Sequence, residues 1–147
     1  MGSTTESSAP ASQPATSRAG RPPLRILYAD DLRELRDVAR ISFSRDGHGI
    51  ECVEDGALAL ERYKADPKID LIITDHHMPN MNGLEFVTRL RELDYHGKIM
   101  VFSSELSEAV ARQYRERHVD RILYKPIFPS ALRQNLAELF PVPPESA

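Results

Sequence analysis

The sequence predicts a doubly wound α/β fold, in which helices cover both faces of a five-stranded parallel sheet. Three observations predict it. Short apolar runs alternate five times with longer segments whose apolar residues recur at helical spacing. The apolar runs are nearly continuous, which is typical of parallel strands buried on both faces. The length of 147 residues, with 41% hydrophobic and 28% charged residues, suits one globular domain.

The first two strand and helix pairs occupy the N-terminal half. The apolar run LRILYA predicts a strand over 24–29, and apolar residues at helical spacing predict a helix over 31–43. A second short apolar run predicts a strand over 50–53. The Asp-Gly turn at 55–56 then leads into a helix expected over 57–64.

The third pair shows the pattern most clearly. The run DLIIT predicts a buried strand over 70–74, and a helix with one apolar side is expected over 83–93. The fourth and fifth pairs follow the same pattern, at 99–102 and 105–115 and at 121–124 and 129–140. Right-handed crossovers between these strands predict the flavodoxin-like order 2-1-3-4-5.

The two ends and the overall composition bound the class of protein. Residues 1–23 contain no Leu, Ile, Val or aromatic residue, so we expect a disordered tail there, a domain over 24–140 and a loose end over 141–147. The single cysteine, Cys52, favours a reducing compartment, and the absence of a long apolar run or signal peptide favours the cytoplasm and no membrane contact. The net charge of −3 indicates no nucleic-acid partner.

Polar residues gather where the expected central strands end. Strand 1 ends in Asp30 and Asp31, strand 3 in Asp75, strand 4 in the Ser103-Ser104 pair and strand 5 in Lys125. Ligands of such folds bind outside the carboxyl ends of the strands, at the switch point between strands 1 and 3. Two like charges ~4 Å apart repel by about 4 kcal/mol at an effective dielectric near 20. Oxygen ligands crowded in this way suit Mg²⁺.

Each of these residues also has a purely structural interpretation. Asp31 with Glu34 resembles a helix capping pair, Asp75 resembles a turn acid, and Ser104 stands where it can cap the fourth helix. A single Lys-Pro pair at 125–126 is an ordinary surface feature. Independent surface choices seldom place acids, a hydroxyl group and a lysine at the ends of four central strands, so the combination favours a binding site.

At these residues the chain resembles the response-regulator receiver domain family, including its single-domain chemotaxis regulators. The resemblance covers about residues 24–140. It is carried by four strings, namely ILYADD at 26–31, DLIITDHHMPNMNG at 70–83, VFSS at 101–104 and LYKP at 123–126.

The resemblance implies a role for each matching residue. Asp75 is expected to accept a phosphoryl group. Asp31, Asp75 and the backbone carbonyl of His77 are expected to hold Mg²⁺, with Asp30 acting through water. Lys125, aimed by a cis bond before Pro126, is expected to pair with a phosphoryl oxygen. Ser103 and Ser104 are expected to contact the phosphoryl group, and Ser103 would report its presence to the fourth helix.

The family also implies the kind of function. A histidine kinase or histidine phosphotransfer protein would donate the phosphoryl group, since none of the five histidines lies in a phosphotransfer helix context. The chain ends soon after the last helix, so we expect a single-domain regulator that acts on an unknown downstream protein. Partner binding and a phosphorelay both stay open. Such a protein assists its own phosphorylation and dephosphorylation but is not an enzyme in the usual sense.

Three other functions share part of this pattern. A zinc site at His76-His77 lacks the sulfur or further histidine ligands it needs. A haloacid-dehalogenase-type phosphatase also uses an aspartyl nucleophile, but it needs a second acid where His77 stands. A pseudo-receiver, which binds a partner without phosphorylation, is the main alternative.

Departures from the family pattern keep that alternative open. Ile122 replaces the usual strand-5 aromatic residue, and His118-Val119 replaces the usual Gly-Ala. Ile122 has few rotamers and cannot swing inward as an aromatic ring does. Tyr124 is expected to share its face of the strand and is a candidate substitute.

Overall fold

The computed structural model describes residues 22–142, so the tail expected at 1–23 and the end expected at 141–147 lie largely outside the described residues. None of the described helices is long and apolar enough to span a membrane. The strands are β2 (Arg25–Ala29), β3 (Gly49–Val53), β4 (Leu71–Asp75), β5 (Lys98–Ser103) and β6 (Arg121–Tyr124). The helices are α2 (Arg33–Arg45), α3 (Gly56–Ala65), α4 (Gly83–Glu92), α5 (Glu108–Glu116) and α6 (Pro129–Leu139).

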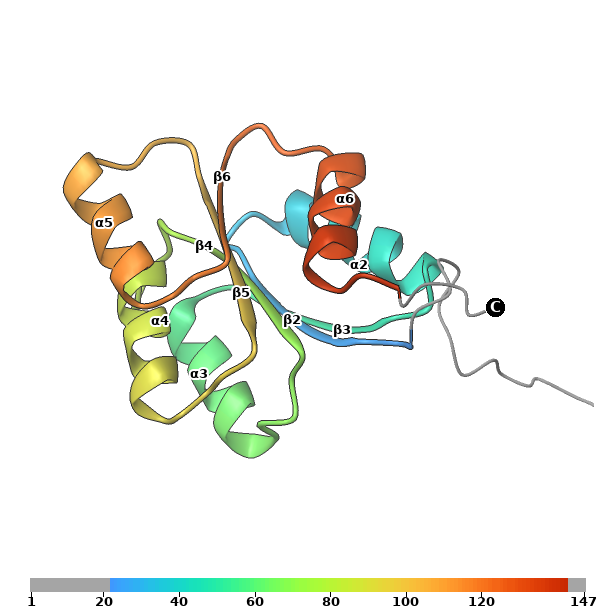
Figure 1. Cartoon of the computed structure of the whole chain (residues 1–147), viewed down its shortest axis with the longest axis horizontal. Coiled ribbons are helices and arrows are strands. Elements are labelled where there is room, and N and C mark those ends of the chain that lie inside the picture. Colours follow the sequence, from blue (N-terminus) through green and yellow to red (C-terminus); the bar gives the residue numbers. More distant parts are fainter. Residues whose placement is uncertain (1–21, 143–147) are drawn as a thin grey trace, which may run out of the picture.

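The five strands form one parallel sheet in the order β3-β2-β4-β5-β6. Counted along the chain this is 2-1-3-4-5, so the predicted fold class is confirmed. Helices α3, α4 and α5 lie on one face of the sheet, and α2 and α6 lie on the other (Figure 1). The neighbours β2 and β4 pair Ala29 with Thr74, and the residues that follow this pair therefore meet at the carboxyl edge.

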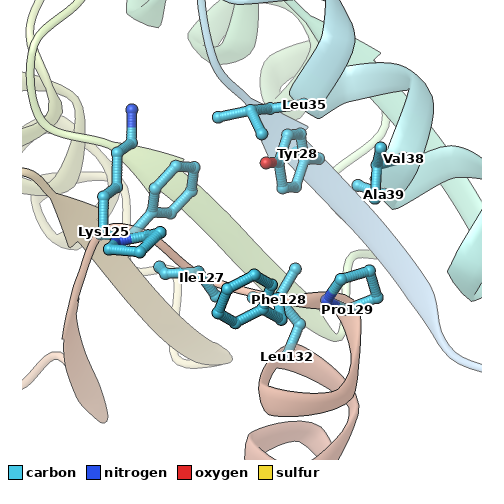
Figure 2. Close-up of a pocket in the computed structure, with 11 residues that line it drawn as sticks. Tyr28, Leu35, Val38, Ala39, Lys125, Ile127, Phe128, Pro129 and Leu132 are labelled. Carbon is cyan, nitrogen blue, oxygen red and sulfur yellow. The ribbon is translucent and has the colours of Figure 1, made fainter.

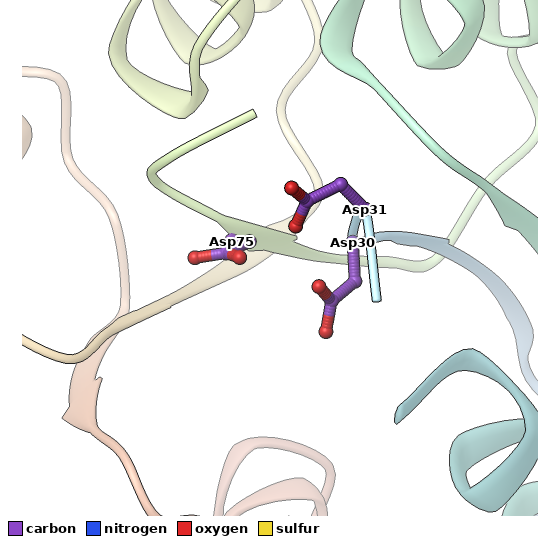
Figure 3. Close-up of side chains that lie close together, drawn as sticks. All are labelled: Asp30, Asp31 and Asp75. Atoms are coloured by element: carbon purple, nitrogen blue, oxygen red, sulfur yellow. The ribbon is translucent and has the colours of Figure 1, made fainter. Parts of the chain in front are cut away.

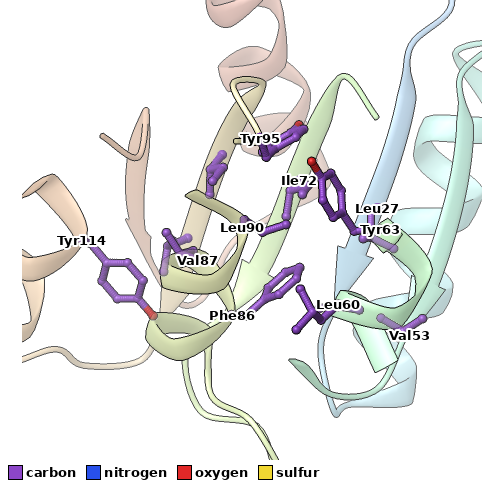
Figure 4. Close-up of a cluster of buried hydrophobic side chains, with 14 residues drawn as sticks. Leu27, Val53, Leu60, Tyr63, Ile72, Phe86, Val87, Leu90, Tyr95 and Tyr114 are labelled. Carbon is purple, nitrogen blue, oxygen red and sulfur yellow. The ribbon is translucent and has the colours of Figure 1, made fainter. Parts of the chain in front are cut away.

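Each face of the sheet carries its own hydrophobic cluster, because successive side chains of a strand point to opposite faces. Leu27 and Ile72 pack with α3, α4 and α5, and Tyr114 of α5 belongs to the same cluster (Figure 4). Tyr28 and Ile73 pack on the other face, with α2 and α6. The near-continuous apolar strands of the sequence are therefore explained by burial on both sides.

The start of α2 corrects one structural interpretation of the sequence. The helix begins at Arg33, its N-cap is Leu32, and no side chain caps it. Asp31 lies before the N-cap, so the interpretation of Asp31 and Glu34 as a capping pair is wrong. Instead the Oδ1 atom of Asp30 accepts a hydrogen bond from the Leu32 backbone N–H at 3.0 Å. The acid that organises this turn is therefore Asp30.

The start of α5 corrects a second structural interpretation, the capping of this helix by Ser104. The helix begins at Glu108, later than the expected residue 105, and its N-cap is Ser107, whose hydroxyl accepts from the Val110 N–H at 3.1 Å. Ser104 therefore does not cap the helix. It is exposed, in the loop that joins β5 to α5. The later start lengthens this loop beside the site.

Candidate functional site

Three carboxylates converge at the carboxyl edge of β2 and β4. One oxygen each from Asp30, Asp31 and Asp75 lies within 4.8 Å of the others. Figure 3 shows them at the ends of the two strands. Within residues 22–142 this is the one group of three or more acidic, histidine or cysteine side chains close enough to hold a metal ion. The structure thus brings together the three acids that were predicted from the sequence to meet.

The members of this acidic cluster differ in their access to water. Asp30 and Asp75 are buried, whereas Asp31 is exposed. Burial, with a further contribution from the negative charge of Asp75, raises the pKa of Asp30 to about 6, although the hydrogen bond from Leu32 acts in the opposite direction. The hydroxyl group of Tyr28 donates to the other oxygen of Asp30 at 3.3 Å. The cluster therefore holds a buried carboxylate whose charge is poorly compensated.

Lys125 supplies the opposite charge. Its Nζ atom donates a hydrogen bond to Oδ2 of Asp75 at 3.1 Å, and its side chain is mostly buried. The same ammonium group lies 5.3 Å from the centre of the Phe102 ring. The peptide bond between Lys125 and Pro126 is cis, as expected. Lysine and aspartate therefore lie in direct contact, although they are distant in the sequence.

The remaining expected site residues border this centre. Ser103 is fully buried at the end of β5, where its Oγ atom donates to the carbonyl of Glu105 at 3.0 Å and accepts from the Glu105 N–H at 3.2 Å. Ser104 is exposed beside it. His77 is also exposed, two residues after Asp75. The Ser103 hydroxyl group therefore makes its hydrogen bonds within its own loop.

One contact was not predicted from the sequence. The side chain of His76 is buried, and its Nδ1 atom lies 2.5 Å from the hydroxyl oxygen of Tyr114 in α5. From the sequence, His76 was a candidate only for a zinc site. The available signal was Tyr114 itself, which lies three residues after the buried Ala111 on the apolar side of its helix.

The two residues considered for the switch lie in different environments. Ile122 is half-buried and packs against the cluster that contains Tyr114. Tyr124 is 52% exposed at the end of β6. His118 has the left-handed φ of 61° that a helix end commonly requires. His118 therefore adopts a left-handed conformation in which glycine is more usual.

An apolar pocket of about 560 Å³ borders the site on the side of α2 and α6. Lys125 and Phe128 contribute to its wall from the segment after β6, and Leu35 and Val38 contribute from α2 (Figure 2). Phe128 is 64% exposed and Val38 is 41% exposed. The lysine that contacts Asp75 therefore also lines a partly exposed apolar surface.

The fold and the site together define a class of protein, a doubly wound α/β domain with an acidic cluster and a lysine at the strand switch point. Comparison with protein families identifies the class further. The model of the response regulator receiver domain matches residues 26–137. The chain belongs to this family, whose members are phospho-acceptor signalling domains of two-component systems rather than enzymes in the usual sense.

Curated relatives carry this domain within longer proteins. The sensor histidine kinase AruS of Pseudomonas aeruginosa is 33% identical over 122 residues, which cover 79% of this chain and 12% of that protein. The DNA-binding transcriptional regulator NtrC of Azospirillum brasilense is 37% identical over 101 residues, which cover 69% of this chain and 21% of that protein. The chain thus spans a small part of the length of these relatives.

Solved structures agree on the fold. The chemotaxis protein CheY4 of Vibrio cholerae superimposes with a TM-score of 0.74 at 26% identity, covering 80% of this chain and 98% of that chain. The CheX–CheY–BeF3–Mg²⁺ complex from Borrelia burgdorferi gives a TM-score of 0.75 at 22% identity, covering 86% and 96%. At this identity the second likeness concerns the fold alone.

Proposed function

We propose that this receiver domain is a phosphorylation-controlled switch whose acceptor is Asp75. The observation that carries the proposal is the meeting of three carboxylates with Lys125, whose Nζ atom lies 3.1 Å from an Asp75 oxygen. A histidine kinase or histidine phosphotransfer protein is the proposed donor. The domain acts in the reducing environment of the cytoplasm, to which its free Cys52 is suited.

The proposed reaction transfers a phosphoryl group from nitrogen to oxygen. A carboxylate oxygen of Asp75 attacks phosphorus, a P–O bond forms, and the P–N bond of the donor phosphohistidine breaks. The donor imidazole leaves with the electron pair and takes up a proton. Phosphoryl transfer depends on positioning and charge neutralisation. Lys125, which now contacts the Asp75 carboxylate, is placed to pair with a phosphoryl oxygen after the transfer.

The residues of the acidic cluster fit a magnesium ion. All the side-chain ligands are carboxylate oxygens, the set that Mg²⁺ prefers, and a bound cation would offset the negative charge of the cluster. Asp31, Asp75 and the backbone carbonyl of His77 are proposed to hold the ion, with Asp30 acting through water. A bound Mg²⁺ neutralises charge on the transferring group.

Ser103 and Ser104 complete the proposed phosphoryl site. The hydroxyl group of Ser103 now bonds to Glu105, so contact with a phosphoryl oxygen requires this hydroxyl group to exchange its partner. That exchange of partners gives the phosphoryl group different contacts in the two states, which a population shift requires. Signalling then follows from altered binding of a downstream protein or from onward transfer of the phosphoryl group.

A donor protein must place its phosphohistidine against Asp75 while resting on the surface around it. The pocket lined by Lys125, Phe128 and Val38 supplies an apolar surface beside the acidic cluster. We assign the docking of the donor to this side of the domain, which leaves α5 on the opposite face of the sheet free for the downstream protein.

Intact mass spectrometry after incubation with acetyl phosphate and Mg²⁺ tests the acceptor. The wild-type protein should gain one phosphoryl group, and Asp75→Asn should gain none. Asp94→Asn is the matched control, because Asp94 is exposed at a left-handed position that asparagine tolerates. Equal labelling of Asp75→Asn and wild type would overturn the assignment. No labelling of the wild type would favour a pseudo-receiver, and turnover of a phosphate monoester would favour a phosphatase.

A further inference from the structure

Two buried side chains, His76 and Tyr114, lie next to the proposed acceptor, Asp75. His76 follows Asp75 in the chain, and its ring meets the Tyr114 ring edge to face, with centroids 5.5 Å apart and an angle of 79° between the planes. The Tyr114 side chain is fully buried, and its hydroxyl oxygen is 2.5 Å from His76 Nδ1. The pair therefore joins the segment that carries the acceptor to helix α5.

The two side chains form one buried hydrogen bond whichever tautomer His76 adopts. Burial raises the pKa of Tyr114, so its hydroxyl group keeps its proton. The bond runs either from the Tyr114 hydroxyl to an unprotonated Nδ1 or from Nδ1–H to the Tyr114 oxygen. In both cases, removing the hydroxyl group would leave a buried imidazole nitrogen without this partner.

The backbone around His76 transmits its position to the site. The His76 N–H donates to the Phe102 carbonyl at 3.0 Å, and the His76 carbonyl accepts from the Gly83 N–H at 2.8 Å. His76 stands between the proposed acceptor, Asp75, and the proposed carbonyl ligand, His77. Any rearrangement of these two residues therefore acts directly on the residue that contacts Tyr114.

Gly83 makes room for the pair. A Cβ atom at this position would lie 2.6 Å from the Tyr114 hydroxyl oxygen and 2.5 Å from the Asp75 carbonyl oxygen, closer than real Cβ contacts allow. The first residue of α4 therefore has to be glycine for the Tyr114 hydroxyl to lie at this distance from His76. The contact is buried where the end of β4, the start of α4 and α5 pack together.

We infer that the Tyr114–His76 hydrogen bond couples the state of Asp75 to α5, so that Tyr114 supplies the aromatic link that Ile122 cannot. The inference rests on the proposed function. Ile122 packs against the same cluster from β6, but it has neither a ring nor a polar atom to follow the phosphoryl site. Tyr114 has both, and it is itself part of the helix that must respond.

The two ends of α5 are expected to respond to the phosphoryl group through different contacts. The loop from Ser103 to Ser107 precedes the helix and senses the phosphoryl group through Ser103, whereas Tyr114 lies in the last turns of the helix. Loss of the Tyr114 hydroxyl should therefore leave the response of the loop intact and remove the response of residues 112–116. Each end has its own contact with the site, so the two responses are separable.

Amide chemical shifts test this, measured with and without beryllofluoride and Mg²⁺ as a phosphoryl mimic. Tyr114→Phe keeps the ring and removes only the hydroxyl group. The matched control is Tyr95→Phe, because Tyr95 is a buried member of the same cluster whose hydroxyl donates to the Ile69 carbonyl at 3.0 Å, away from the acceptor. His76→Phe removes the imidazole nitrogen instead, and the double variant shows whether the two changes act through one contact.

We expect Tyr114→Phe to lose the beryllofluoride-induced shifts at 112–116 and to keep those at Ser103 and Ser104, with wild-type behaviour in Tyr95→Phe. His76→Phe and the double variant should lose the same shifts as Tyr114→Phe. Wild-type shifts at 112–116 in Tyr114→Phe would overturn the coupling alone, and so would equal losses in Tyr95→Phe. A wild-type protein that does not bind the mimic would instead overturn the proposed function, and the coupling with it.

Discussion

Replacing Asp30 by asparagine should stabilise the domain in the absence of Mg²⁺. Asp30 is fully buried beside Asp75 and Asp31, and its pKa is raised to about 6, chiefly by burial. Asparagine has nearly the same shape and keeps an oxygen for the Leu32 N–H. The change therefore removes a buried charge with little change in packing.

The size of the effect follows from the pKa. The step from the ordinary value of 3.8 to about 6 sets an upper limit of about 3 kcal/mol for the free energy of unfolding lost through Asp30 ionisation. Water reaches this cleft through the exposed Asp31, and Lys125 offsets part of the charge, so we expect a gain of about 1 to 2 kcal/mol. For a domain of this size the melting temperature should rise by about 3 to 10 °C.

The pH dependence distinguishes this cause from a packing effect. The folded state binds its Asp30 proton more tightly than the unfolded chain, so ionisation lowers the stability of the wild type as pH rises from about 4 to about 6, and the loss persists above that window. Thermal melts of Asp30→Asn, wild type and the control Asp94→Asn across this range measure it. A gain that is equal at both ends of the window, or absent at high pH, would refute the reasoning.

Two further predictions concern the metal and the switch. Asp31→Ala should abolish the rise in melting temperature that Mg²⁺ gives the wild type, and Asp30→Ala should only weaken it; an unchanged response in Asp31→Ala contradicts the ligand assignment. Beryllofluoride with Mg²⁺ should shift the amides of the Ser103–Glu105 loop strongly and those of Ile122 and Tyr124 weakly. Large shifts at Tyr124, lost in Tyr124→Ala together with partner binding, would place the switch two residues beyond its usual position.

The fold could be predicted because its signals are local and repeated. Continuous apolar runs such as 71–73 identify buried parallel strands, and the handedness of the crossovers then limits the strand order to few choices. Helix starts were less accurate, because several polar residues compete for each cap. At α5 the expected cap was Ser104, but the hydroxyl that caps the helix belongs to Ser107, three residues later in the same polar loop.

The acidic cluster could be predicted for a similar reason. Asp30 directly follows β2 and Asp75 is the last residue of the neighbouring β4, so the strand order alone brings them together. Their difference from Asp31 in burial could not be predicted, because it depends on how the turn before α2 closes over Asp30. The sequence therefore shows which charges meet, and the structure shows which of them water reaches.

The usual aromatic residue of the fifth strand, here β6, shows the limit of comparing sequences residue by residue. Its absence at Ile122 directs attention to Tyr124, which belongs to the same strand but is half exposed. A close-packed core requires its volume to be filled, whichever element supplies the side chain. In this domain a buried aromatic ring comes from Tyr114 of α5, and its hydroxyl group reaches His76 beside the acceptor. A contact between residues 38 positions apart leaves no local pattern, so only the packing of α4, α5 and the sheet reveals it.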